Sequence, residues 1–299
     1  MPIPRKAAYR IAHFGDLHLE SHKGKFRDEG EFPHAIAMVD HAIQNGADHF
    51  VFSGDILDAA DADVLNAFVG ELLARKLADA DAVTVVPGNH DVFPLGWPLQ
   101  VSDLWRTITR TAHSNFEHFA QATAWSRRGK MAGELFSNAP YPFAKSLRDD
   151  VVLVGLDTTI NDKNLPTSWA TGELSEEDAD AAKEFFRQHR KAVHRIVVMH
   201  HYPFADFKDV NPMINMKFVK PDPATVRNWL GRTDATLVLC GHIHAKRDKK
   251  AAEGFRVICT DSLNPYIRKG DDHELRCYRL IELHTTGGVT VSDQFVGSA

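Results

Sequence analysis

The chain has 299 residues, of which 43% are hydrophobic and 25% are charged. This composition is typical of a folded globular protein and excludes a disordered or fibrous chain. The formal charge of −5 excludes a general attraction to nucleic acid or anionic membranes, although a local basic groove is compatible with it.

The three cysteines indicate a reducing compartment. Cys240, Cys259 and Cys277 lie far apart and have no CxxC spacing, so the sequence predicts neither a zinc finger nor a disulfide framework. The first residues contain no apolar core of a signal peptide, and no run approaches the roughly 18 consecutive apolar residues that span a bilayer. We therefore expect a cytoplasmic protein without a membrane span. The sequence does not indicate its oligomeric state.

Short apolar runs alternate with helical patterns in the first third of the chain. Residues 9–14, 49–54 and 82–86 are rich in β-branched and aromatic side chains, which predicts strands. Residues 32–46 and 62–80, which lie between these runs, have the apolar spacing of helices. This alternation predicts an α/β architecture with a largely parallel central sheet.

The first of these helices has a predicted apolar face and a predicted end. Phe32, Ile36, Val39 and Ile43 fall on the apolar face. Gly46 is expected to end the helix, because glycine adopts the left-handed conformation that is common at this position.

The rest of the chain becomes increasingly β-rich. Residues 95–145 are irregular, and we expect a helical insertion there. Residues 151–159 predict a strand, and residues 175–189 predict a helix with Ser175 as its N-cap. No repeat or linker divides the chain, so we expect one domain, residues 1–299. The later strands, some of them antiparallel, are predicted at residues 194–201, 235–244, 255–261, 275–283 and 288–295.

Five of the predicted strands end in Asp, His or Asn. In extended backbone, residues i and i+2 point to the same side, so Asp16 with His18, and His242 with His244, are each expected to direct two side chains toward one point. Ligand sites of open α/β sheets form at the carboxyl ends of strands. The polar residues at these ends are Asp16 and His18; Asp55 and Asp58; Asn89, His90 and Asp91; His200 and His201; and His242 and His244.

These side chains offer oxygen and imidazole nitrogen but no thiolate. Such a set suits Mn, Fe, Zn or Co, and it is richer in nitrogen than Mg or Ca prefer. Each pattern alone has an ordinary explanation, because Gly-Asp after a strand is common turn chemistry and a single Asp-x-His is usually a solvated loop. All five patterns at the ends of apolar runs are better explained by one metal site.

The patterns DLH, GD, GNHD, H and GHIH, in this order from Asp16 to His244, resemble the calcineurin-like metallophosphoesterases. The resemblance implies an α/β fold of two packed mixed β-sheets flanked by helices, in four layers (α-β-β-α). It also implies two divalent or trivalent metal ions as cofactors. One ion is then assigned to Asp16, His18, Asp55 and His244, and the other to Asp55, Asn89, His200 and His242, with Asp55 bridging.

The resemblance also implies roles for the neighbouring polar residues. In MHHYP it favours His200 as the ligand, and His201 then faces the substrate cleft or packs outside it. His90 is implied as the catalytic imidazole, which hydrogen-bonds a phosphoryl oxygen and protonates the leaving alkoxide. Asp58 matches the acid that orients this histidine in the phosphoprotein phosphatase branch, and Asp91 is the alternative.

The implied reaction is hydrolysis of a phosphoester by in-line attack of a metal-bridging hydroxide. The stretch GELS (172–175), the form HHYP and the negative charge favour a small phosphodiester, such as a cyclic nucleotide or a glycerophosphodiester. A DNA nuclease of the same superfamily is the alternative, because DLHLE also resembles that branch, but no Lys/Arg-rich stripe with aromatics supports nucleic acid as a partner. A phosphomonoesterase or protein phosphatase is less favoured, since GDILDAA and GNHD depart from the phosphatase forms. A metal-poor binding scaffold would lack ligands, and none is missing.

Overall fold

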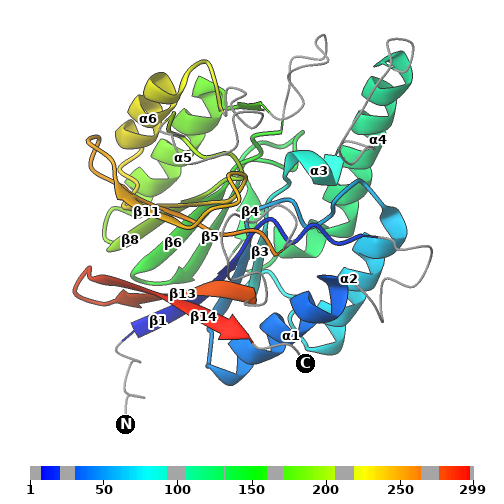
Figure 1. Ribbon diagram of the computed structural model, residues 1–299. Coiled ribbons are helices and arrows are strands. Elements are labelled where there is room, and N and C mark those ends of the chain that lie inside the picture. Colours follow the sequence, from blue (N-terminus) through cyan, green and yellow to red (C-terminus); the bar gives the residue numbers. More distant parts are fainter. Residues whose placement is uncertain are drawn as a thin grey trace.

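Two β-sheets lie face to face at the centre of the molecule, and helices cover their outer sides (Figure 1). This arrangement confirms the predicted fold class of two mixed β-sheets flanked by helices. The computed structural model describes residues 8–20, 31–92, 105–130, 132–159, 171–205, 219–263 and 276–296.

The five-stranded sheet has the order β14-β13-β1-β2-β3. Strands β1, β2 and β3 are parallel, whereas β13 is antiparallel to β1 and β14 is antiparallel to β13. The three parallel strands therefore bring their carboxyl ends to one edge. The strands are β1 (Ala8–Phe14), β2 (His49–Phe52), β3 (Val83–Val85), β13 (Arg276–His284) and β14 (Val289–Val296).

The seven-stranded sheet has the order β11-β12-β10-β8-β6-β5-β4. Strands β6, β8, β10 and β12 are parallel, and β4, β5 and β11 run antiparallel to their neighbours. The three antiparallel strands were not predicted, because they are short or carry charged and partly exposed residues. The strands are β4 (Ala132–Glu134), β5 (Phe143–Arg148), β6 (Val151–Gly155), β8 (His194–Val198), β10 (Leu237–Cys240), β11 (Arg247–Lys250) and β12 (Arg256–Cys259).

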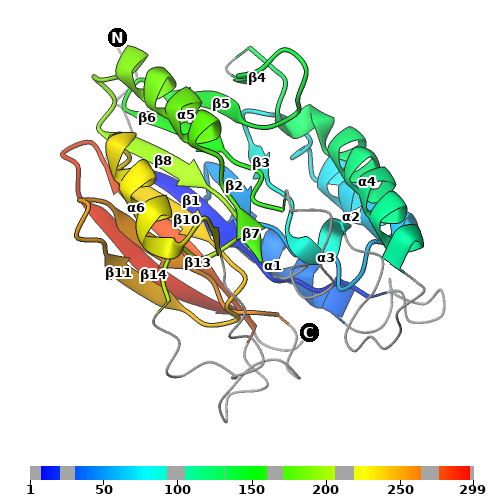
Figure 2. The ribbon, with the colours of Figure 1, turned by 90° about the horizontal axis from the view of Figure 1, so that it is seen from above.

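A pair of two-residue strands and seven helices complete the described chain. Strand β7 (Gly172–Glu173) pairs in parallel with β9 (Val219–Lys220). Helix α4 lies beside α2 and α3 (Figure 2). No described helix has the length and apolar character that crossing a membrane requires. The helices are α1 (Glu31–Gln44), α2 (Ala62–Ala74), α3 (Asn89–Val92), α4 (Trp105–Ala122), the 3-10 helix η1 (Ala124–Ser126), α5 (Glu176–Gln188) and α6 (Pro223–Arg232).

Alternating side chains of the strands build separate buried clusters. Ile11 and Val51 of the five-stranded sheet meet Leu153 and Ile196 of the seven-stranded sheet in the layer between the sheets. The residues that alternate with these along the same strands face the helices, because neighbours along a strand point to opposite sides. The sandwich of two sheets is therefore held by apolar burial on both faces of each sheet.

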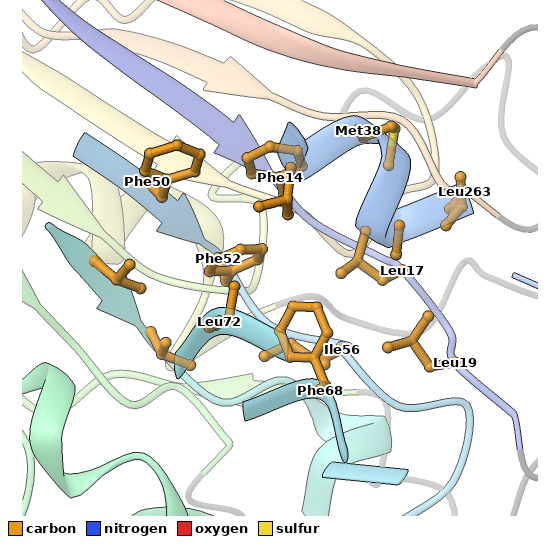
Figure 3. Packing of buried hydrophobic residues seen from close by; sticks show 14 of the residues in the cluster. Phe14, Leu17, Leu19, Met38, Phe50, Phe52, Ile56, Phe68, Leu72 and Leu263 are labelled. Atoms are coloured by element: carbon orange, nitrogen blue, oxygen red, sulfur yellow. The ribbon is translucent and has the colours of Figure 1, made fainter. Parts of the chain in front are cut away.

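The outer layer of the five-stranded sheet is rich in aromatic residues (Figure 3). Phe14, Phe50 and Phe52 project from β1 and β2 toward helices α1 and α2. The rings of Phe52 and Phe68, the latter from α2, meet edge to face with centroids 5.3 Å apart. On the other sheet, an equivalent cluster packs beneath α5 and α6.

The helix predictions are largely confirmed, with two corrections. Gly46 has a left-handed φ of 68°, and Ser175 Oγ accepts a hydrogen bond from the Asp178 amide at 3.0 Å, as expected at a helix end and an N-cap. Ile43 is 40% exposed, because α1 packs through a face with small residues at positions 35 and 42. Helix α2 ends at Ala74, since Lys76 has a φ of 59° that cannot continue a right-handed helix.

Candidate metal centre

The loops after five parallel strands meet where the carboxyl edges of the two sheets adjoin. The loop after β1 runs beside the loop after β2, with the Asp16 amide donating to the Gly54 carbonyl at 3.1 Å and the His18 amide to the Asp55 carbonyl at 3.0 Å. The His242 amide, after β10, donates to both Asp16 carboxylate oxygens at 2.8 and 2.9 Å. Hydrogen bonds therefore join the two sheets at this edge.

Left-handed backbone, rather than extended strand, directs the histidine and aspartate side chains. Both i, i+2 pairs lie beyond the strand ends, so strand alternation does not direct their side chains. Asp16 and His18 nevertheless meet in one group, as predicted, whereas the prediction for His242 and His244 is wrong. Seven described non-glycine residues have positive φ, and five of them are candidate ligands. Such backbone is strained for these residue types and clusters at functional sites. The five have φ values of 53° at Asp16, 48° at His18, 51° at Asp55, 75° at His242 and 49° at His244.

Glycines at the strand ends leave room for the candidate ligands. A Cβ atom on Gly88 would lie 2.2 Å from Asp55 Oδ1, and one on Gly54 would lie 2.6 Å from His200 Nδ1. Gly54 also has a φ of 89°, which side-chain-bearing residues rarely adopt. The glycines of the GD and GNHD patterns are therefore required for the close approach of the loops.

The first group of candidate ligands consists of Asp16, His18, Asp55 and His244. One ligand-type atom from each lies within 4.8 Å of the others. His18 Nε2 and His244 Nε2 are 3.0 Å apart, His244 Nε2 is 3.8 Å from Asp16 Oδ1, and His18 Nε2 is 3.9 Å from Asp55 Oδ2. Two imidazole nitrogens at this separation fit a shared cation.

The second group consists of Asp55, Asn89, His200 and His242. Asn89 Oδ1 lies 3.2 Å from His200 Nε2 and 3.1 Å from His242 Nδ1, and these two nitrogens are 3.2 Å apart. Asp55 Oδ2 lies 3.3 Å from His200 Nε2. His242 and His244, two residues apart, thus belong to different groups and do not meet at one point.

Asp55 belongs to both groups. Its Oδ1 accepts the His90 amide at 2.9 Å, while Oδ2 is buried and has no hydrogen-bond partner among the described residues. A buried carboxylate oxygen without a donor is costly, and a cation is the partner that removes this cost. The orphaned oxygen between the two groups therefore fits a bridging ligand.

The carboxylates of the centre differ in their pKa shifts. Burial raises the pKa of Asp16 to about 7. Burial also opposes ionisation of Asp55, but the neighbouring imidazoles, led by His200, outweigh it and hold its pKa well below the usual range. Asp55 therefore stays an anion, as a bridging ligand must.

The imidazoles fall into two classes. Burial, reinforced by neighbouring imidazoles, holds the pKa of His242 and of His244 well below the ordinary value, so both rings are neutral. For His200, burial is outweighed by Asp55 and Asp16, which raise its pKa to about 9. A cation at the second group would thus displace a proton from His200.

The family follows from the sequence comparison. Residues 9–246 match the family described as calcineurin-like phosphoesterase. The chain belongs to this family. The membership implied by the strand-end patterns is confirmed.

Solved structures of similar fold include two phosphatases. A dimetal phosphatase from Danio rerio has a TM-score of 0.62 at 12% identity, and the alignment covers 98% of this chain and 100% of that chain. Purple acid phosphatase PPD1 from yellow lupin (Lupinus luteus) has a TM-score of 0.55 at 12% identity, with 98% of this chain and 52% of that chain covered. At such identities the likeness shows the fold alone. No curated protein matches this phosphoesterase.

A carbonyl oxygen, instead of a carboxylate, holds His90 in this phosphoesterase. His90 Nδ1 donates to the main-chain oxygen of Asp58 at 2.6 Å. The Asp58 carboxylate turns to the first group instead, with Oδ1 3.3 Å from His18 Nδ1. Asp58 thus contacts His90 through its backbone and His18 through its side chain, and a ligand-type atom of each of the three residues lies within 4.8 Å of the others. The role of the Asp58 carboxylate in orienting His90 stays a prediction.

Asp91 has a structural role in the turn. Its Oδ1 accepts the Leu57 amide at 2.9 Å, and its Oδ2 accepts the Gly88 amide at 2.8 Å. Burial raises the pKa of this carboxyl to about 7. Both oxygens hold the loops of β2 and β3 together, so Asp91 is not the group that orients His90.

Two supporting groups escaped sequence reasoning. The Ser53 carbonyl lies 2.9 Å from His200 Nδ1, which therefore donates and leaves Nε2 for the second group. Thr158 Oγ1 lies 2.8 Å from Nδ1 of His201, the second histidine of HHYP. The sequence could have indicated Thr158, since it is a polar residue at the end of a predicted strand, as the candidate ligands are.

Proposed function

We propose that this phosphoesterase is a two-metal hydrolase of small phosphodiesters. The observation that carries the proposal is the buried Asp55 Oδ2, which has no hydrogen-bond partner among the described residues and lies between the two ligand groups. Hydrolases that use two ions bind them close together and share ligands between them.

The donor chemistry supports two ions of the Mn, Fe, Zn or Co class. Asp16, His18, Asp55 and His244 would hold one, and Asp55, Asn89, His200 and His242 the other, since both sets mix carboxylate or amide oxygen with imidazole nitrogen. When bound, such ions supply a water of lowered pKa and neutralise charge on a phosphoryl group.

His90 is the proposed acid–base residue. It is partly exposed, and its ring meets that of His18 edge to face, with centroids 4.7 Å apart. Since Nδ1 carries the proton donated to the Asp58 carbonyl, Nε2 is the nitrogen that we propose contacts the substrate. Nε2 would accept a proton in the neutral ring, and it would return one to a leaving alkoxide from the imidazolium.

Two features support a small diester as the substrate class. The net charge of −5 opposes attraction to polyanions, and the stretch Gly172–Ser175 resembles phosphodiesterases of small molecules. The cysteines Cys240 and Cys259, which are register partners in β10 and β12, are free thiols, which favours the cytoplasm as location.

The first test compares hydrolysis of bis(p-nitrophenyl) phosphate with that of p-nitrophenyl phosphate. The protein is stripped of metal, then reloaded with Mn²⁺. We expect diester turnover that requires metal and falls at least about 100-fold in Asn89→Ala, because an ion would lose an oxygen ligand. Asn45→Ala is the matched control, since Asn45, in the turn after α1, donates to the Tyr278 hydroxyl at 3.0 Å, away from the centre.

The outcomes separate the candidate reactions. Preference for the monoester would contradict the diester proposal and favour a phosphatase. Turnover of neither ester by protein that binds two ions would contradict the small-substrate proposal and favour a large substrate such as DNA.

A further inference from the structure

His201, the second histidine of HHYP, lies against the second ligand group. Its side chain is fully buried, and its ring centroid is 4.5 Å from that of His242 and 4.9 Å from that of His200. A ring nitrogen of His201 lies within 4.8 Å of ring nitrogens of both neighbours. The residue thus belongs to the wall of the second metal position.

Thr158 fixes the ring and its tautomer. Thr158 Oγ1 accepts the His201 amide at 3.3 Å and lies 2.8 Å from His201 Nδ1. Among the described residues, His201 Nδ1 is the acceptor within reach of the Thr158 hydroxyl hydrogen. The hydroxyl therefore donates to Nδ1, and the imidazole proton is on Nε2.

Strand β7 packs closely against the His201 ring. A Cβ atom on Gly172 would lie 2.3 Å from His201 Cγ, so the strand approaches this closely only with glycine. The Glu173 amide donates to the Thr158 carbonyl at 2.9 Å and anchors β7 to the same residue that holds the ring. The GELS stretch, Thr158 and His201 therefore form one unit.

His201 Nε2 has no hydrogen-bond partner among the described residues, although it is buried. A buried N–H group without an acceptor is rare in folded proteins. With a proton on Nε2 this nitrogen has no lone pair for a metal ion, so it is suited to an anionic oxygen.

We infer that His201 binds the substrate: its Nε2–H donates a hydrogen bond to a phosphoryl oxygen held at the second metal position. The inference rests on the proposed function, since a phosphate group must occupy the centre. It explains why HHYP has a second histidine and why GELS has a glycine opposite it. His201 and His90 would then contact the phosphoryl group from different sheets.

The test measures inorganic phosphate binding by isothermal titration calorimetry to the Mn²⁺-loaded protein, which needs no turnover. His201→Phe keeps the ring but removes the donor, and we expect phosphate to bind about 10- to 100-fold more weakly, the range of a hydrogen bond to a charged group. Mn²⁺ stoichiometry and affinity, titrated separately, should not change. His201→Gln, which retains an N–H donor, should recover part of the loss.

Thr158→Val provides a second test that leaves His201 in place. Valine has the shape of threonine but no hydroxyl, so the tautomer is no longer fixed, and we expect about a 3- to 10-fold loss of phosphate affinity. His41→Phe on α1 is the control and should bind phosphate like the wild type.

Two results would overturn the inference: wild-type phosphate affinity in His201→Phe and Thr158→Val, or loss of one Mn²⁺ equivalent in His201→Phe, which would make the residue a metal ligand. Failure of the proposed function is distinguishable. If the wild-type protein hydrolyses neither ester, the proposed function is contradicted. If the His201→Phe variant nevertheless binds phosphate more weakly than the wild type, the inference is still supported.

Discussion

The two sheets bring different chemistry to the candidate metal centre. The loops of the five-stranded sheet supply Asp16, Asp55 and Asn89, which are all its oxygen donors, together with His18. The loops of the seven-stranded sheet supply only imidazoles. All negative charge of the centre therefore belongs to one sheet, and ions bound there would join the two sheets across their edge.

The contacts between the two sheets show the same complementarity. Asp55 Oδ2 lies 3.3 Å from His200 Nε2, and Asp16 accepts the His242 amide. Each contact brings a carboxylate of the five-stranded sheet close to a nitrogen of the seven-stranded sheet. One carboxylate, Asp55, therefore lies where the two ligand groups meet, whereas each of the other candidate ligands belongs to a single group.

The largest expected effect comes from breaking this shared position. Asp55→Asn removes the anionic oxygen common to both groups, so we expect diester turnover to fall at least about 1,000-fold, or about 4 kcal/mol in transition-state stabilisation. Mn²⁺ stoichiometry, measured by elemental analysis, should fall below two. Asp40→Asn on α1, which pairs with Arg75 at the surface, is the control. Two tightly bound ions in Asp55→Asn would contradict the shared role.

A smaller effect is expected from substituting a residue that supports only one of the two ligand groups. Asp58→Asn weakens the contact with His18 but keeps the backbone carbonyl that holds His90. We expect about 10- to 100-fold weaker binding of one Mn²⁺ ion, as for other groups that orient metal-bound histidines. Unchanged metal affinity with an altered pH–rate profile would show that the carboxylate acts on His90 after all.

The smallest effect concerns stability and a buried histidine of the five-stranded sheet that is not a candidate ligand. Burial, with a contribution from Arg279, lowers the pKa of His13 to about 3, against an ordinary value of 6.5. Folding favours the neutral form of His13. The contribution of this preference to the free energy of unfolding is therefore complete above pH 6.5 and is lost as the pH falls toward 3.

The measurement is urea unfolding in the presence of a chelator between pH 7 and pH 4. His13→Leu should show a weaker loss of unfolding free energy with falling pH, by up to about 1.4 kcal/mol per pH unit below 6.5. At pH 7 the variant also loses the 3.0 Å contact with Ser53 Oγ, a cost of about 1 kcal/mol. Identical slopes in variant and wild type would show that His13 is not the residue responsible.

Much of the fold and of the centre could be predicted from local patterns. Apolar runs identified β1, β2, β3, β6, β8, β10 and β12, because burial on both faces selects continuous β-branched and aromatic segments. The runs of β13 and β14 were identified as well, although β14 is partly exposed along its whole length. The short strands β4 and β11 carry partly exposed or charged residues, and tertiary pairing decides such segments. Ile43 was assigned to the buried face of α1, but tertiary packing buries the face with small residues at positions 35 and 42 instead.

The sequence by itself determined which residue types stand at the strand ends, and therefore that oxygen and imidazole ligands would gather at one edge. Only the tertiary structure decided how they are used. The left-handed backbone sends His242 and His244 to different groups, and the main-chain carbonyl of Asp58 accepts a hydrogen bond from His90 Nδ1. Residue spacing does not encode these outcomes, because backbone conformation beyond a strand depends on contacts with loops that are distant in the chain.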